Sequence, residues 1–118
     1  MKEIIQYLYN PKNREKKGVV IALTQEGSNK FAVGVSVTKS VDKFNKELGK
    51  TIARGRAIES LENGNSVFVP ASVLENVAFF SNRAKLYFKD RQLGHDFYSS
   101  WKNKIGTKIS GKTAITAK

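Results

Sequence analysis

The sequence predicts an α+β fold in which a small antiparallel sheet packs against two helices. Residues 17–38 have the composition of a β-hairpin, and one or two further strands are expected elsewhere. Residues 41–62 and a later segment from residue 72 carry apolar residues three and four positions apart, which is the repeat of an amphipathic helix. The 118 residues, 40% of them hydrophobic, suffice for one modest core. We expect a single domain over residues 1–104 and a basic C-terminal tail over residues 105–118.

The hairpin is expected from two apolar runs, KGVVIALTQ and KFAVGVSVT, on either side of a turn-forming segment at residues 26–29. In the second run, apolar residues alternate with smaller ones, as they do when one face of a sheet is buried. The alternating apolar residues are Phe31, Val33, Val35 and Val37. Residues 3–9 are compatible with an edge strand or a short helix, and their isoleucine and tyrosine content favours the strand. Residues 66–69 form a further short apolar run, which Pro70 ends.

The first helix is expected over residues 41–62, with Ser40 as its N-cap. Its predicted apolar stripe consists of Val41, Phe44, Leu48, Ile52 and Gly55. Gly55 has no side chain, so another backbone could approach the helix closely at that point. A basic row recurs at the same spacing on the opposite side, consisting of Lys39, Lys43, Lys46, Lys50 and Arg54. This row is either a cationic binding track or an ordinary solubilising surface.

The second helix is expected to begin at Ser72 and to reach residue 92, or even Trp101, because Ser72 and Glu75 have the spacing of a capping box. Its predicted core stripe consists of Val73, Val77, Phe80, Ala84, Tyr87 and Phe88. A second apolar line, formed by Phe79, Leu86 and Leu93, repeats every seven residues on another side. A monomer with one sheet has little use for two apolar sides on one helix, so we expect a homodimer or higher homo-oligomer. The alternative is that the N-terminal segment or the tail covers this line.

The charge of the chain limits the class of partner. It has 21 basic and 10 acidic residues, a formal net charge of +11, which attracts polyanions. Nucleic acid is the usual partner of such a protein, nucleotides are another, and a basic surface that merely aids solubility is the plain alternative. The basic residues are concentrated in 39–56 and 83–118, whereas 57–82 contain none. We expect folding to bring the two basic segments together.

The location of the protein is predicted from what the sequence lacks. The N-terminal apolar stretch is too short and too interrupted for a signal peptide. No segment approaches the length of a membrane span. The absence of cysteine removes any support for secretion. We therefore expect a cytoplasmic protein with no membrane partner.

Groups that could perform catalysis are scarce. The single histidine, His95, has no evident orienting carboxylate, and the segment at residues 94–96 has the composition of a turn. Residues 106–113 match the phosphate-loop pattern GxxxxGK[ST], but only five residues follow, too few for the helix that this motif requires. The acidic residues lack metal-binding spacing, and no serine lies in a nucleophile-elbow sequence. We expect a binding protein that is not an enzyme and has neither a metal nor a cofactor.

The segment most typical of a ligand site lies in the second helix, at residues 79–85. It combines an aromatic ring, an amide and two cations, which together can stack on a base, read its edge and neutralise a phosphate. Arg56 is expected at the edge of the apolar arc of the first helix, from where it could reach into a crevice. The predicted ligand-binding residues are Arg56, Phe79, Asn82, Arg83 and Arg91. The alternative is that Phe79 belongs to the core or the subunit contact and that Asn82 makes a routine hydrogen bond.

Two resemblances add functional expectations. Residues 17–22, followed by the valine-rich second strand, resemble the opening of a KOW-type barrel, which several phage DNA- and RNA-binding regulators contain. The whole layout is similar to the small phage proteins that defeat the Thoeris defence system: a basic N-terminal antiparallel sheet, a helix at 40–62 and a long helix from Ser72 with a dimer contact. Those proteins are sponges that sequester cyclic ADP-ribose isomers without cleaving them.

The second resemblance implies that this chain sequesters a small cyclic nucleotide, in the host cytoplasm, between two subunits. A phage-type DNA- or RNA-binding regulator is the alternative. We favour the small ligand at this point, because the arginines, the aromatic ring and the amide cluster at the predicted subunit contact, whereas the basic row is mostly lysine.

Overall fold

The computed structural model describes residues 1–38, 43–89 and 91–99. Within these ranges it confirms the α+β prediction. Four strands form one sheet in the order β1-β2-β3-β5. They are β1 (Lys2–Tyr9), β2 (Lys16–Thr24), β3 (Lys30–Val37) and β5 (Gln92–Leu93). The first three pair antiparallel, and β5 adds a short parallel pairing to β3.

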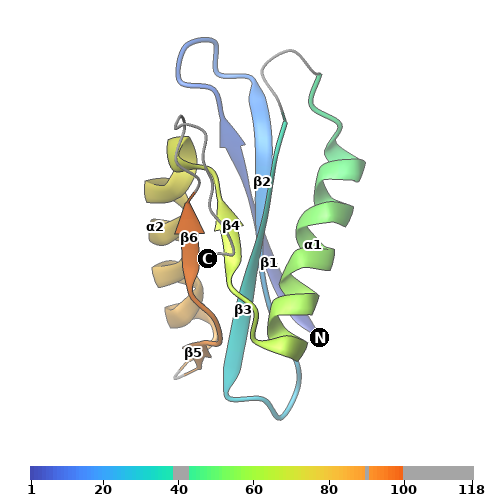
Figure 1. Ribbon diagram of the computed structural model, residues 1–118, viewed down its shortest axis with the longest axis vertical. Coiled ribbons are helices and arrows are strands. Elements are labelled where there is room, and N and C mark those ends of the chain that lie inside the picture. The colour runs from blue at the N-terminus through green and yellow to red at the C-terminus, as the bar shows by residue number, and fades with distance from the viewer. Residues whose placement is uncertain (39–42, 90, 100–118) are drawn as a thin grey trace.

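The sheet lies in the middle of the molecule with a layer on each face (Figure 1). On one face lies α1 (Lys46–Asn63). On the other lie α2 (Leu74–Tyr87), the preceding 3-10 turn η1 (Ala71–Val73) and a separate parallel pair formed by β4 (Val67–Val69) and β6 (Phe97–Ser99). Each face therefore has its own hydrophobic core.

The central strand β2 is covered on both faces, which explains its continuous apolar run. Five successive residues are 0% exposed: Val19, Val20, Ile21, Ala22 and Leu23. The odd-numbered members pack toward α1 and the even-numbered ones toward α2 and β4. A strand buried on one face only would alternate apolar with polar residues, so this run reflects the three-layer arrangement.

The structure confirms the strands that the sequence predicted and contains two more, β5 and β6. The hairpin of β2 and β3 turns at residues 25–29, where Gly27 has a φ of +83°, a left-handed conformation that glycine adopts without strain. Residues 3–9 form an edge strand, as favoured. The run at residues 66–69 is β4, but β5 and β6 had no separate sequence signal and lie where a helix was expected.

The first helix differs from the prediction in its start and in its buried side. It begins at Lys46, because the Asn45 side chain accepts a hydrogen bond from the Leu48 amide at 3.0 Å and caps it there. Ser40 and Val41 lie outside the described residues. The buried residues of α1 are Gly49, Ala53, Ala57 and Ser60. The predicted stripe is therefore wrong for Leu48, which is 58% exposed, and for Gly55, which faces open space. Phe44 precedes the helix and does pack against the core under α1.

Small side chains are buried because α1 lies directly on β3. A Cβ atom added to Gly34 would lie 2.6 Å from the Ala57 amide nitrogen and would also overlap the Ala53 carbonyl oxygen. The close backbone approach expected at Gly55 thus occurs at Gly34, on the strand. Larger residues in the buried row of the helix would push α1 away from the sheet.

The second helix is shorter than predicted. It ends at Tyr87, and the chain then turns through Lys89, whose φ of 45° is left-handed, so that β5 can pair with β3. The expected capping box does not form: Ser72 lies in η1, and Val73 precedes the helix without a side-chain cap. Most of the predicted core stripe is buried, but Tyr87 is 59% exposed. Leu93 lies in β5, so it does not continue the second apolar line of the helix.

The tail at residues 105–118, with its match to a phosphate loop, lies outside the described residues. Within them, neither helix combines the length and the apolar character that crossing a bilayer requires.

The contact between Gly34 and α1 predicts opposite effects for the same substitution at two glycines. Gly34→Ala should lower the free energy of unfolding by about 1–3 kcal/mol, because the added methyl group forces α1 off the sheet. Gly55→Ala should raise it by about 0.5–1 kcal/mol, because Gly55 lies in the helix with nothing within 4 Å of an added Cβ. Urea unfolding of both variants measures the two values. Equal effects at the two positions would contradict the close contact.

Candidate functional site

The structure separates the five predicted ligand residues. Arg56 lies on α1, and its Nη1 donates a hydrogen bond to the Val35 carbonyl at 2.7 Å. Arg91 directly precedes β5, and its Nε donates to the Ser28 carbonyl in the hairpin turn at 2.8 Å. These two arginines are thus engaged by backbone acceptors at different places, and Arg56 lies across the sheet from α2.

Three of the five predicted residues share one surface on α2. Phe79, Asn82 and Arg83 are all exposed, Phe79 by 64%. Arg83 Nη1 also donates to Gln6 Oε1 on β1 at 3.1 Å, so this arginine holds the helix against the edge strand. Phe79 is not a core residue, which leaves it available for a partner or a ligand.

The two basic segments do not come together in the described part of the chain. The first contributes α1, on one face of the sheet. The second contributes Arg83, Lys85 and Lys89, on and just after α2 on the opposite face, and Arg91, which bonds to the turn between β2 and β3. The described residues thus do not form one merged basic surface, and the other basic residues of the second segment lie outside the described part of the chain. The reason is the central sheet, which both helices cover from opposite sides.

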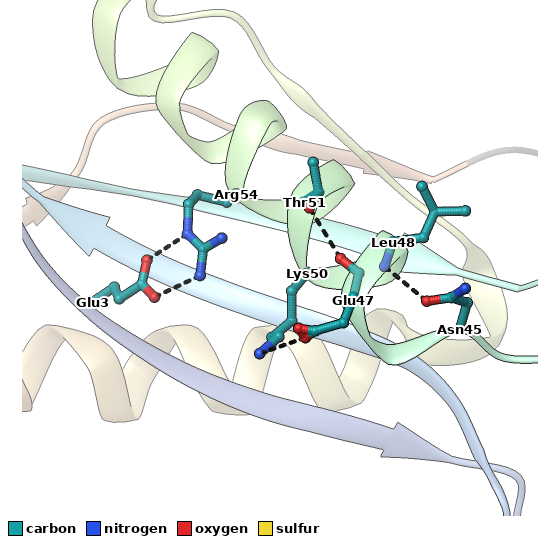
Figure 2. A network of polar contacts seen from close by, with 7 residues as sticks. All are labelled: Glu3, Asn45, Glu47, Leu48, Lys50, Thr51 and Arg54. Carbon is teal, nitrogen blue, oxygen red and sulfur yellow. Dashed lines mark hydrogen bonds and ion pairs between the residues drawn. The ribbon is translucent and has the colours of Figure 1, made fainter.

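Two members of the basic row on α1 contact acidic residues of the same chain. Arg54 donates two hydrogen bonds of 2.9 Å to the carboxylate of Glu3 on β1, one from Nε and one from Nη2 (Figure 2). The hydrogen bond from Arg54 lowers the pKa of Glu3, and burial partly opposes this effect. Lys50 lies 3.3 Å from the exposed carboxylate of Glu47 one turn away. Arg54 thus fastens α1 to the edge strand and contributes little free charge.

Lys46, at the start of α1, has a different environment. Its Nζ lies 5.7 Å from the ring centroid of Tyr7 on β1, and Lys16 Nζ of β2 lies 5.1 Å from the same centroid. Phe44 meets Tyr7 edge to face, with centroids 6.3 Å apart. The Tyr7 ring therefore attracts two ammonium groups from different elements through cation–π interactions.

Tyr9 continues this surface along β1. Tyr7 packs against the core on the α1 side and Leu8 is buried in the core on the α2 side. The alternation of β1 therefore indicates the α1 side for Tyr9, at the point where the pairing with β2 shifts its register. Tyr9 pairs with Lys16 in the register of β1 and β2, and it is 52% exposed. We call this group the Tyr9 surface; it consists of Tyr7, Tyr9, Lys16, Phe44 and Lys46.

The sequence contains one signal for the Tyr9 surface. Two tyrosines separated by one leucine in a strand place both rings on one side. The proximity of Phe44, Lys46 and Lys16 to those rings had no such signal, because each comes from a different part of the chain.

His95 lies in the bend between β5 and β6, as its turn-like neighbours indicated. It is only 7% exposed, and neither ring nitrogen has a hydrogen-bond partner among the described residues. Its ring packs against Phe97 with centroids 5.6 Å apart. Burial lowers the pKa of His95, and the charge of Asp96 partly offsets this. In residues 1–38, 43–89 and 91–99, no three histidine or carboxylate side chains lie where they could share a metal ion.

The buried His95 predicts a loss of stability in mild acid. Its folded-state pKa lies below the ordinary 6.5, so the unfolded chain binds the proton more readily than the folded one. The stabilisation of neutral His95 should be intact above pH 6.5 and should decline as the pH falls below that value. His95 is the only histidine, so thermal melts of wild type and His95→Leu between pH 7.5 and 5.5 isolate its contribution. An unchanged pH dependence in His95→Leu would contradict this account.

Comparisons of the chain with models of protein families, with curated proteins and with solved structures found no match. The chemistry of its own residues therefore has to indicate what this protein binds. Two exposed features of the described residues bear on that question: the Tyr9 surface on the α1 side and the Phe79 side of α2.

Proposed function

We propose that this protein binds single-stranded nucleic acid without cleaving it, in the cytoplasm. The observation that carries the proposal is the Tyr9 surface, where half-exposed Tyr9 pairs with Lys16 in the sheet and the ammonium groups of Lys16 and Lys46 lie over the nearby Tyr7 ring. An exposed ring can stack on a base, and nearby ammonium groups can neutralise the phosphates on either side of it. The net charge of +11 supplies the long-range attraction that such binding uses.

A single strand fits this surface better than a duplex. In a duplex the faces of the bases are stacked on one another, so a protein ring cannot reach them without disrupting the helix. A strand-borne tyrosine with lysines at its side instead matches the combination of stacking platform and cationic path found in single-strand binders. The group contains no amide, carboxylate or guanidinium side chain, the types that read base edges through two hydrogen bonds, so we expect little sequence preference.

The placement of the arginines also favours this proposal over the small-ligand pocket that the sequence first suggested. Arg56, Arg83 and Arg91 each donate a hydrogen bond within the protein, and they lie in three different places. Lys16 and Lys46 form no ion pair with any described acidic residue and converge on one ring. The lysines thus carry the available charge, and they lie next to an aromatic ring.

Substitutions in the Tyr9 surface should separate stacking from charge. Tyr9→Ala should weaken binding of a labelled single-stranded oligonucleotide by about 5- to 100-fold, the loss of one stacked base. Lys46→Ala should weaken it less and should reduce the slope of log affinity against log salt by about 0.7, the value for one phosphate contact on a single strand. Fluorescence anisotropy across a salt series measures both quantities.

Matched controls come from the opposite side of the sheet. Tyr87 on α2 is 59% exposed and Lys85 is exposed on the same helix, so Tyr87→Ala and Lys85→Ala make the same changes away from the Tyr9 surface. Both should retain wild-type affinity. Absence of binding at low salt, or equal losses in the controls, would refute the proposal.

A second candidate is the sequestration of a small cyclic nucleotide, such as a cyclic ADP-ribose isomer, without cleavage. It is favoured by the exposed ring, amide and guanidinium that Phe79, Asn82 and Arg83 present on α2. These groups can stack on a base, bond its edge and contact a phosphate.

Calorimetric titration with cyclic ADP-ribose isomers tests this candidate. Asn82→Ala should weaken binding about tenfold through the loss of one hydrogen bond in a shielded site, whereas Asn76→Ala, an exposed asparagine on the same helix, should have no effect. Intact ligand should be recovered after heat denaturation. A titration without heat, or recovery of a cleaved product, would exclude the sponge.

A further inference from the structure

The outward side of α2 carries apolar residues that the core does not use. Phe79 and Leu86 are 64% and 80% exposed, although each is a large apolar side chain. At about 100° per residue they lie within about 20° of one another, on the side of α2 opposite its buried stripe. That buried stripe includes Val77, Phe80, Ala84 and Phe88. The helix therefore has two apolar sides, and only one of them contacts the sheet.

Polar residues complete this outward side in a regular order. Asn82 lies between the two apolar residues, three positions after Phe79 and four before Leu86. Glu75 lies seven positions before Asn82, in the first turn of α2. Lys89 lies seven positions after it, at the left-handed turn that follows the helix, so it marks the basic end of this side and is not part of the helical repeat. We call this line the α2 seam; it consists of Glu75, Phe79, Asn82, Leu86 and Lys89.

We propose that the α2 seam binds the α2 seam of a second copy of this chain, with the two helices antiparallel and the twofold axis near Asn82. In that arrangement Phe79 lies beside the partner's Leu86, and Glu75 lies beside the partner's Lys89. Phe79 and the partner's Leu86 are then three and four positions from the axis, and Glu75 and the partner's Lys89 are each seven positions from it in the sequence.

The order of charges along α2 selects this arrangement. The acidic residue of the seam is at the start of the helix, and the basic residues Lys85 and Lys89 are at its end. Parallel helices would place like charges together, whereas antiparallel helices place opposite charges together and also oppose the helix dipoles favourably. Asn82 lies near the axis and therefore meets the partner's Asn82, where each side-chain amide can donate a hydrogen bond to the oxygen of the other.

The occupant is a second copy, because a surface that complements itself about one residue needs no other partner to satisfy it. Glu75 and Lys89 form no ion pair with any described residue of their own chain, so both are available to the partner. The proposal does not depend on nucleic-acid binding, because the Tyr9 surface lies on the opposite side of the sheet.

Sedimentation velocity of the full chain over a range of concentrations tests the proposal. The wild-type protein should shift from a 13.2 kDa species to one of twice that mass as concentration rises. Leu86→Glu should raise the dimer dissociation constant at least about tenfold, because it places a charge opposite the partner's Phe79. Leu48→Glu makes the same change at an exposed leucine of α1 and should leave the mass unchanged.

Charge reversal tests the antiparallel register. Glu75→Lys alone should weaken the dimer about two- to fivefold, and adding Lys89→Glu should restore it. Thermal melts show whether each variant is folded, and all the substituted side chains are exposed in the monomer. A wild-type protein that is monomeric at every concentration, or a double variant no better than Glu75→Lys, would overturn the proposal.

Salt distinguishes this proposal from nucleic-acid binding. Salt screens both the repulsion between two chains of charge +11 and the attraction of the Glu75–Lys89 pairs, so the dimer should depend on salt much less steeply than oligonucleotide binding does. Leu86→Glu should retain oligonucleotide binding to each copy, and Tyr9→Ala should retain the dimer. The experiments can therefore refute the dimer while oligonucleotide binding stands, or refute oligonucleotide binding while the dimer stands.

Discussion

The double burial of β2 is the constraint on which the rest of this structure depends. Five successive residues of the strand are fully buried, alternately under α1 and under α2 with β4. Both faces of the sheet must therefore be covered, and each helix can cover only one. The three-layer arrangement follows, and with it the separation of α1 from α2 (Figure 1). Gly34 sets the depth of one of these contacts, because it lets the backbone of α1 rest on β3.

This separation produces two exposed surfaces with different chemistry. The α1 side presents tyrosines with converging lysines, which suits a flexible polyanion. The α2 side presents an apolar seam with one acidic and one basic end, which suits a second copy of the chain. The two surfaces lie on opposite sides of the sheet, so a dimer formed through α2 would leave both Tyr9 surfaces accessible. Two linked copies on one strand would then bind it more tightly than one copy can.

The arginines and the lysines of this protein have different roles in the structure. Arg54, Arg56, Arg83 and Arg91 each donate to an acceptor that is distant in sequence, on β1, on β3 or in the hairpin turn. A planar guanidinium with several donors is suited to joining elements in this way. These four arginines therefore connect elements of the fold, whereas Lys16 and Lys46 lie over the ring of Tyr7.

The sequence by itself determined the elements whose signal is local. The alternation from Phe31 to Val37 identified the hairpin, and the seven-residue spacing of Phe79 and Leu86 identified an outward side of α2 that the structure indeed leaves exposed. The buried side of α1 was decided only by tertiary structure. Hydrophobicity favoured Leu48, but Gly34 on a distant strand requires the small residues Ala53 and Ala57 at the contact. The Tyr9 surface also arises only on folding, because β1, β2 and the start of α1 each supply part of it, and no local pattern records which elements will lie side by side.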